Sequence, residues 1–293
     1  MNKNDIARYF QNKRAIENLH ALSKGQAPAH EFVPILKQAM DGVKLVAINV
    51  ANPILYRGRF NEQGRLFCRV EEITYPKSEF VKNKGRLNDV GQSVLYAAAC
   101  ELGTIIEMTV GVGNVFTISK IVRRDDSKMF FFPIGIPKLI GDQHNPTQAE
   151  KIIHDYFQAE MTKDRVIFDD YNSTIAIGNM LLGQLIANYP IAPRTGVVYP
   201  SVRSRLASNT TTYNVAIEPP TFDQNYLITE SIVYILTFEN THYQINPVNK
   251  GTVEENGEIL WRFSYDEMKN RVEKGLWEDG FFNASIVKCA ANL

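Results

Sequence analysis

Two stretches of the sequence decide which fold the chain can adopt: PILYRGRF at residues 53–60 and GRLNDVGQSVLYAAACELGTIIEM at residues 85–108. Leu55 to Phe60 and Val94 to Ala98 are short and largely apolar, so each is expected to form a β-strand. In Ala99 to Met108 the apolar residues recur on one helical face, which predicts a helix packed on a sheet. Strands and helices mixed in this way favour an α+β fold with a mixed sheet.

The flanking segments extend this pattern. Apolar residues recur near helical spacing from Ile6 to Leu22 and from Glu31 to Met40, so residues 1–43 are expected to form an N-terminal helical segment. From Lys44 onward the chain becomes rich in strands. Besides the two strands above, strands are expected at residues 45–50, 66–72, 115–122, 129–133, 197–202 and 213–217, with 115–122 and 129–133 forming a hairpin.

Two helices and a C-terminal extension complete the outline. One helix is expected after Thr147 and a second from Thr174 to Asn188, ahead of a proline that cannot continue it. Alternation from Ile228 to Phe238 predicts a further strand, and Asn256-Gly257 suits a type I′ hairpin turn. A last helix is expected from Asp266 to Gly275. We therefore divide the chain into residues 1–43, a core of residues 44–220, and a hairpin-and-helix extension of residues 221–293 packed on that core.

The composition predicts a compact globular protein and argues against two kinds of partner. The 293 residues are 44% hydrophobic and 22% charged, enough to build a core. Lys plus Arg and Asp plus Glu number 32 each, so no net charge draws the chain to nucleic acid or anionic lipid. The opening MNKNDIARYF lacks the apolar core of a signal peptide. A cytoplasmic protein that contacts neither nucleic acid nor membrane is therefore expected.

Common catalytic motifs do not occur in the sequence. Gly111-Val112-Gly113 has Phe116 where a dinucleotide fingerprint needs a third glycine, and no GxxxxGK[ST] phosphate loop occurs. The five histidines are scattered without HExxH or GxSxG, and the three cysteines form no CxxC pair. No metal site and no hydrolase triad are therefore expected.

Polar residues interrupt the apolar, strand-like sequence of residues 53–60 and 85–108. Arg57 and Arg59 share one face of a strand because side chains alternate, and Arg86 begins the second stretch directly after a glycine. Guanidinium groups gathered in this way suit a diphosphate or a carboxylate. Local pattern alone leaves open that the arginines are solvated or paired across strands, and that Tyr56 and Tyr96 are ordinary sheet aromatics.

Glu107 is the candidate acid of this region. It follows Ile105 and Ile106, where a buried carboxylate would need a hydrogen-bonding or charged partner, or else a functional role. A half-exposed helix with Glu107 facing water is the alternative. Glu101 lies on the same expected helix and could take the catalytic role instead.

Taken in order, these residues resemble the RES domain, which is named for its Arg, Glu and Ser residues. The resemblance rests on Tyr56-Arg57-Gly58-Arg59, then Gly85-Arg86-Leu87-Asn88, Gly91, Leu95-Tyr96 and Glu107. The run GVVYPSVRSRLASNTTTYNVAIEP at residues 196–219 resembles the serine segment of that domain and places the family's serine at Ser201. The matching pieces span residues 54–219.

The resemblance implies a fold like that of ADP-ribosyltransferases, with residues 44–220 as the NAD-binding core. It also implies an enzyme that takes NAD as substrate, without a cofactor, and cleaves the bond between nicotinamide and ribose. Glu107, Arg57 and Ser201 would be catalytic, with Glu107 stabilising the ribosyl cation. NAD would be bound by Tyr56, Arg57, Arg59, Arg86, Asn88, Tyr96 and Ser201.

The same resemblance implies a biological setting. Members of the family resemble the toxic half of toxin–antitoxin pairs, so a toxin or defence effector restrained by a cognate antitoxin is expected. The acceptor of the ribosyl group stays open between water, phosphate and a protein side chain. A different class of function, a non-catalytic protein that senses a nucleotide in the same pocket, is the alternative.

Overall fold

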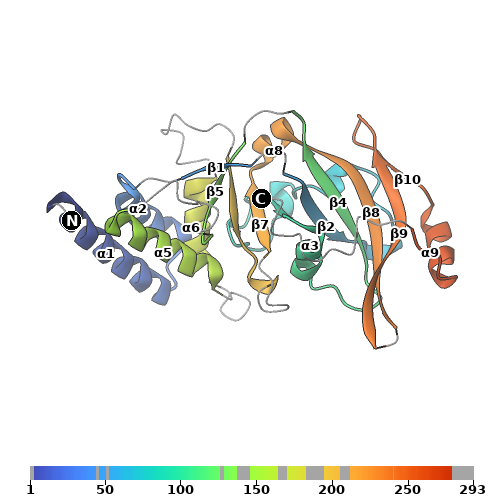
Figure 1. The fold of residues 1–293 in the computed structure, drawn as a ribbon, viewed down its shortest axis with the longest axis horizontal. Helices are drawn as coiled ribbons and strands as arrows, with labels where there is room; N and C mark the ends of the chain where they lie inside the picture. The colour runs from blue at the N-terminus through green and yellow to red at the C-terminus, as the bar shows by residue number, and fades with distance from the viewer. Residues whose placement is uncertain are drawn as a thin grey trace.

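A computed structural model describes residues 3–43, 46–50, 53–125, 129–136, 146–163, 170–182, 195–204, 212–239 and 241–278. Helices α1 (Lys3–Lys24), α2 (Ala29–Met40), α5 (Gln148–Thr162) and α6 (Asn172–Leu181) gather at one end of the molecule, and a sheet extends from them toward the other end (Figure 1). The N-terminal helical segment predicted from the sequence is confirmed by α1 and α2.

Ten strands form one mixed sheet within the described part of the chain, in the order β1-β5-β6-β7-β3-β2-β4-β8-β9-β10. Only β5 and β6 pair in parallel among them. The predicted α+β class with a mixed sheet is therefore confirmed. The strands are β1 (Ile48–Asn49), β2 (Leu55–Phe60), β3 (Leu95–Ala98), β4 (Val115–Arg123), β5 (Phe130–Pro133), β6 (Thr195–Pro200), β7 (Tyr213–Ile217), β8 (Tyr226–Glu239), β9 (His242–Val253) and β10 (Ile259–Trp261).

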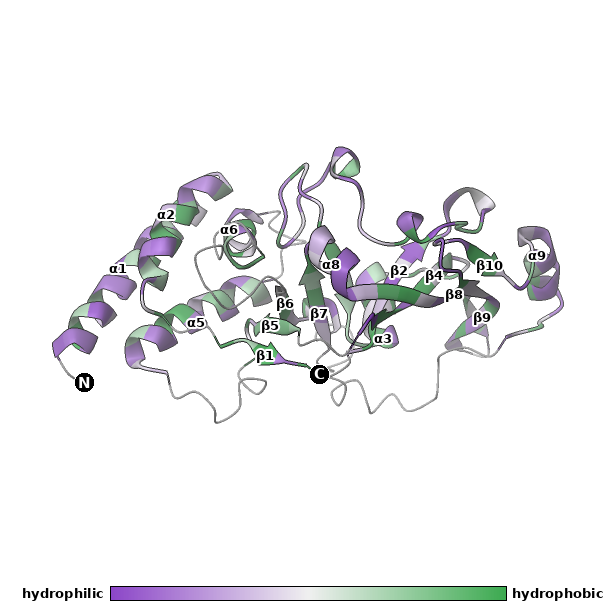
Figure 2. Cartoon of the chain, turned by 90° about the horizontal axis from the view of Figure 1, so that it is seen from above, coloured by the Kyte–Doolittle hydropathy of each residue, from purple (hydrophilic) through white to green (hydrophobic). Residues whose placement is uncertain are grey.

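Both faces of the central strands are buried. On one face, Val197, Tyr199 and Ala216 pack with the cluster of helices α1, α2, α5 and α6. On the other, Val198 and Val215 belong to a second apolar core. Strands β5 and β7 accordingly consist largely of hydrophobic residues, whereas α1 at the outer end is largely hydrophilic (Figure 2). Burial of both faces fixes the register of these strands, because a slip of one residue would exchange the two faces.

The helix α3 (Glu101–Met108) lies directly on β2, and Gly58 makes this close approach possible. A Cβ built on Gly58 would lie 2.1 Å from Sδ of Met108 and 2.7 Å from Cγ2 of Thr104. Both distances are far below a normal carbon contact. A residue without a side chain is thus needed here to bring α3, and with it Glu107, onto the sheet.

Three expectations about strands and turns are wrong. Residues 66–72 do not form a strand, because the carboxylate of Glu72 accepts hydrogen bonds from the backbone N–H groups of Cys68 and Arg69 and stabilises a short 3-10 helix, Val70–Glu72. The segments 115–122 and 129–133 do not form a hairpin. Strand β4 already has β2 and β8 on its two edges, so β5 pairs with β1 and β6 instead.

The hairpin that joins β9 to β10 exists, but its turn is not type I′. Gly257 has a positive φ of 81°, whereas Asn256 is not among the described residues with positive φ. A type I′ turn needs positive φ at both central positions. The N–H of Glu254 donates to the carbonyl of Glu258 at 2.9 Å and closes a loop of three residues, 255–257, which ends on a left-handed glycine. Within it, the N–H of Gly257 donates to the carbonyl of Glu254 at 2.9 Å.

The remaining elements extend the sheet or cover it. Helix α8 (Pro219–Asn225) packs against β8, and α9 (Tyr265–Glu273) against β9. Strands β8, β9 and β10, from the predicted extension 221–293, continue the same sheet as the core. Helix α6 ends at Leu181, and most of the rest of the helix expected as far as Asn188 lies outside the described residues. No described helix has the length and apolarity required to cross a bilayer.

Candidate active site

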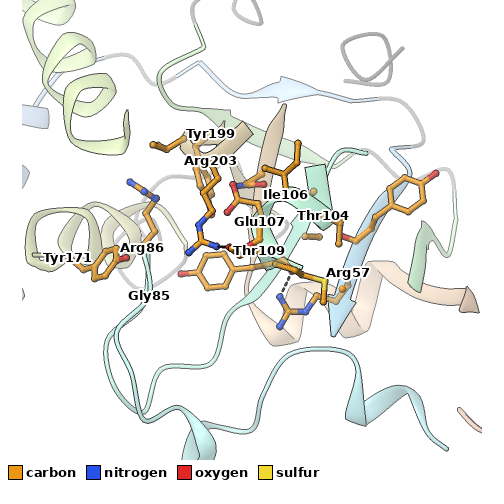
Figure 3. Close-up of a pocket in the computed structure, with 18 residues that line it drawn as sticks. Arg57, Gly85, Arg86, Thr104, Ile106, Glu107, Thr109, Tyr171, Tyr199 and Arg203 are labelled. Atoms are coloured by element: carbon orange, nitrogen blue, oxygen red, sulfur yellow. Dashed lines mark hydrogen bonds between the residues drawn. The ribbon is translucent and has the colours of Figure 1, made fainter. Parts of the chain in front are cut away.

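A cavity of about 750 Å³ opens beside β2 and β3, at the point where their ladder ends. These strands pair only at Tyr56 and Ala98 and separate beyond that pair. Residues from α3, β6, β7 and the 85–86 turn complete the wall. Figure 3 shows Glu107 near the middle of this cavity, Arg57 at one end, and Arg86 with Tyr171 at the other. A volume of this size is ordinary for a small-molecule site.

Glu107 sits in the last turn of α3, and its carboxylate is held from one side. Oε1 accepts a hydrogen bond from Oγ of Ser201 at 2.5 Å and another from Nδ2 of Asn214 at 2.9 Å. Oε2 has no hydrogen-bond partner among the described residues, and Glu107 forms no ion pair with any of them. One carboxylate oxygen is therefore fixed and the other is available.

The C-terminus of α3 is capped by Arg203, which lies in the serine segment, residues 196–219. Nη1 of Arg203 donates to the backbone carbonyl of Glu107 at 2.7 Å and also to Oγ1 of Thr109. Thr109 ends the helix in the left-handed conformation with φ 55°. A cation at this position satisfies a carbonyl that the helix leaves unpaired and complements the helix dipole. Arg203 thus orients the backbone of Glu107 without pairing with its carboxylate.

Arg57 is a half-buried cation with no carboxylate partner among the described residues. Its Nη1 donates to the carbonyl of Tyr96 at 2.8 Å, where the β2–β3 ladder has stopped. Its Nε is buried and has no hydrogen bond to a described residue. Burial, followed by the charge of Arg59, lowers the pKa of Arg57 to about 9. An uncompensated guanidinium in a cavity wall is suited to an anionic ligand.

Arg86 and Tyr96 line the cavity while also holding the walls. Nη1 of Arg86 donates to the carbonyls of Met161 and Lys163 at the end of α5, at 2.9 and 3.3 Å. The hydroxyl of Tyr96 accepts from the N–H of Leu87 and donates to Oδ1 of Asn88, both at 2.8 Å. The turn that presents Arg86 is therefore tied to the ring of Tyr96.

Three of the residues predicted to bind NAD, Arg59, Asn88 and Ser201, are not part of the cavity wall, whereas Tyr56 is. Arg59 donates to the carbonyls of Ile73 and Thr74, which hold its guanidinium against the neighbouring loop. The side chain of Asn88 is engaged with Tyr96. Arg59 and Asn88 thus support the wall rather than face the cavity.

Glu101 stands in the first turn of α3 and is not among the residues that line the cavity. It is 8% exposed, and Oε1 accepts a hydrogen bond from the hydroxyl of Tyr234. Burial raises the pKa of Glu101 to about 7, the hydrogen bond from Tyr234 opposes this shift, and the charge of Glu230 adds to it. Of the two acids on this helix, Glu107 is therefore the one placed to meet a ligand.

The cavity residues that were not singled out from the sequence include Tyr171, Tyr199, Arg203 and Asn214. Tyr199 is 4% exposed, and its hydroxyl has no hydrogen bond to a described residue. Burial raises the pKa of Tyr199 well above its ordinary value, and the Tyr96 hydroxyl and Glu107 add to the shift while Arg86 and Arg57 oppose it. Tyr199 is thus within electrostatic reach of most of the site.

Comparison with protein families identifies the chain. The profile of the RES domain matches residues 49–236, which make up more than half of the chain. The chain belongs to the RES-domain family. This confirms the resemblance seen in the sequence. Comparisons with curated proteins and with solved structures gave no match.

The matched region contains every residue that lines the cavity. Arg57, Arg86, Tyr96 and Glu107 come from distant parts of the RES domain and meet at one cavity, and Ser201 touches its central carboxylate. Within the described residues, no cluster of His, Cys, Asp and Glu could hold a metal ion.

Proposed function

We propose that this RES-domain protein is an enzyme that consumes NAD by cleaving the bond between nicotinamide and ribose. The observation that carries the proposal is the state of Glu107. One of its oxygens is fixed by two donors, the other has no partner among the described residues, and no described cation neutralises its charge. A carboxylate presented in this way can stabilise a positive charge that develops in the cavity.

The chemistry follows from that arrangement. As the bond from C1′ of the ribose to nicotinamide breaks, its electron pair leaves with nicotinamide, which departs neutral. The remaining ribosyl group acquires oxocarbenium character, and Oε2 of Glu107 stabilises this charge while accepting a hydrogen bond from a ribose hydroxyl. An oxygen of water or phosphate, or a protein side chain, then forms the new bond at C1′, and the proton that water or a neutral side chain loses passes to solvent.

The rest of the cavity supplies binding groups for a dinucleotide. Arg57 or Arg86 would hold the diphosphate, since a guanidinium grips its oxygens in pairs. The rings of Tyr56 and Tyr96 offer faces for the cationic nicotinamide, a contact worth up to about 2 kcal/mol when water is excluded. The hydroxyl of Tyr199, which has no hydrogen bond to a described residue, would donate to the ligand. Arg59 and Asn88 would act by holding these walls.

The wider assignment rests on the family. We propose an ADP-ribosyltransferase-like active-site region and a role as a toxin or defence effector in the cytoplasm, restrained by a cognate antitoxin. Expression in cells should then lower NAD and arrest growth, and Glu107→Gln should remove both effects. Normal growth and NAD with the wild-type protein would contradict the toxin assignment alone.

The enzymatic claim is tested by incubating the purified protein with NAD and measuring free nicotinamide. The wild type should release nicotinamide, and Glu107→Gln should reduce the rate by about 100-fold or more while NAD still binds, because one electrostatic group of the transition state is lost. Glu101→Gln is the matched control on the same helix and should keep the wild-type rate.

Three outcomes decide between the functions. Near-wild-type release by Glu107→Gln removes this residue from the mechanism. NAD that binds to the wild type but survives intact indicates the nucleotide sensor instead. Absence of both binding and release contradicts the NAD assignment altogether.

A further inference from the structure

We propose that Asn214 is a positioning residue that, together with Ser201, holds one oxygen of Glu107 so that the other is directed to the substrate. This inference rests on the proposed function and assigns a role to a residue that the sequence pattern did not reveal. Asn214 stands in β7, where its backbone pairs with Ala98 of β3 and with Tyr199 of β6. It therefore projects from a strand that is paired on both edges.

The two donors converge on a single atom. Nδ2 of Asn214 lies 2.9 Å from Oε1 of Glu107, and Oγ of Ser201 lies 2.5 Å from the same oxygen. Ser201 is 1% exposed, and its Oγ also accepts from the N–H of Ser204 at 3.0 Å. Its hydroxyl is thus already engaged on both sides. We therefore assign Ser201 to the carboxylate, rather than to direct contact with the substrate.

The neutrality of both donors matters for the reaction. Arg203 is a cation beside Glu107, and it binds the backbone carbonyl of Glu107 instead of the carboxylate. An arginine paired with the carboxylate would fix it equally well but would offset the charge that must face the ribosyl cation. An amide and a hydroxyl fix the position and leave the negative charge in place.

Loss of Asn214 should therefore affect turnover more than binding. A hydrogen bond to a charged group is worth enough to predict a loss of about 10- to 100-fold in kcat for Asn214→Ala. The KM for NAD should stay within about threefold, because the amide of Asn214, although it lines the cavity, donates to Glu107 rather than to the ligand. The same change should have no effect once the carboxylate is gone.

The test is a double-mutant cycle on nicotinamide release, with wild type, Asn214→Ala, Glu107→Gln and the double variant. Asn246→Ala is a matched control, since Asn246 is also 8% exposed and donates a 2.9 Å hydrogen bond, to Thr237, far along the sheet. It should keep the wild-type kcat. Should Asn214→Ala not fold, Asn214→Asp retains the shape, replaces the donor by a like charge, and should lower kcat at least as much.

The expected result is a double variant no slower than Glu107→Gln. The inference is overturned if Asn214→Ala slows Glu107→Gln by the same factor as it slows the wild type, if it raises KM with kcat unchanged, or if it changes neither. In those cases an active wild type and an impaired Glu107→Gln still uphold the proposed function. An inactive wild type contradicts the proposed function, and this inference with it.

Discussion

At the scale of single residues, the site contains two opposite charges that the described structure does not neutralise. Glu107 has neutral donors on one oxygen and no described cation on the carboxylate, and Arg57 has a carbonyl acceptor and no described anion. An unpaired charge that is partly buried costs free energy, so such groups indicate a site where a bound ligand supplies the opposite charge. NAD carries the matching pair, a cationic nicotinamide riboside and an anionic diphosphate.

Glu101 provides a residue-scale prediction about stability. Its pKa is raised to about 7 in the folded protein, so between its ordinary value and about 7 the folded state binds a proton that the unfolded state has lost. Stability should thus fall as pH rises through this window and level off above it. Glu101→Gln should remove this fall and be more stable than the wild type at pH 8, by on the order of 1–3 kcal/mol.

The measurement is the free energy of unfolding by urea at pH 5 and pH 8 for both proteins. An equal change between the two pH values in wild type and Glu101→Gln would show that another group causes it.

At the scale of elements, the site depends on the contact between α3 and β2. Gly58 allows Thr104 and Met108 to lie against the strand, and the last turn of α3 then carries Glu107 to its donors on β7 and after β6. Neither element is long, so small displacements at Gly58 are transmitted directly to the carboxylate.

Gly58→Ala should therefore impair catalysis through packing. The added Cβ would force Thr104 and Met108 away, and we expect a loss of stability of about 1–3 kcal/mol together with at least a tenfold loss in nicotinamide release. Gly25→Ala is the control, because its Cβ would meet backbone atoms at an ordinary 3.5 Å. Thermal unfolding and steady-state rates measure the two effects. Wild-type behaviour of Gly58→Ala would refute the role given to this contact.

The positions of strands and helices along the chain were easier to predict from the sequence than the pairing of the strands in the sheet. Strand β2 and helix α5 begin where local pattern places them, since alternation and the capping box at Thr147 are local signals. The pairing of β4 with β8 and of β5 with β6 joins segments far apart in the chain, which no local signal specifies. Arg57 and Glu107 were recognisable in the sequence because they are charged residues within apolar stretches. Asn214 and Tyr199 did not, because polar and aromatic residues are common in strands.

At the scale of the whole molecule, the cavity lies where the helical end of the protein meets the sheet. Arg86 binds the end of α5, and Nζ of Lys84 donates to Oδ1 of Asn172 at the start of α6, at 2.7 Å. The turn that lines the cavity is thus anchored to both helices. The architecture brings together residues separated by more than a hundred positions, as Figure 3 shows for Arg57, Glu107 and Arg203.

The most direct test of this account is a crystal structure of Glu107→Gln soaked with NAD, a variant chosen because it should bind NAD without consuming it. The ribose that carries nicotinamide should lie against residue 107, with the diphosphate at Arg57 or Arg86. NAD bound away from residue 107, or with its adenosine half in that place, would contradict the central claim.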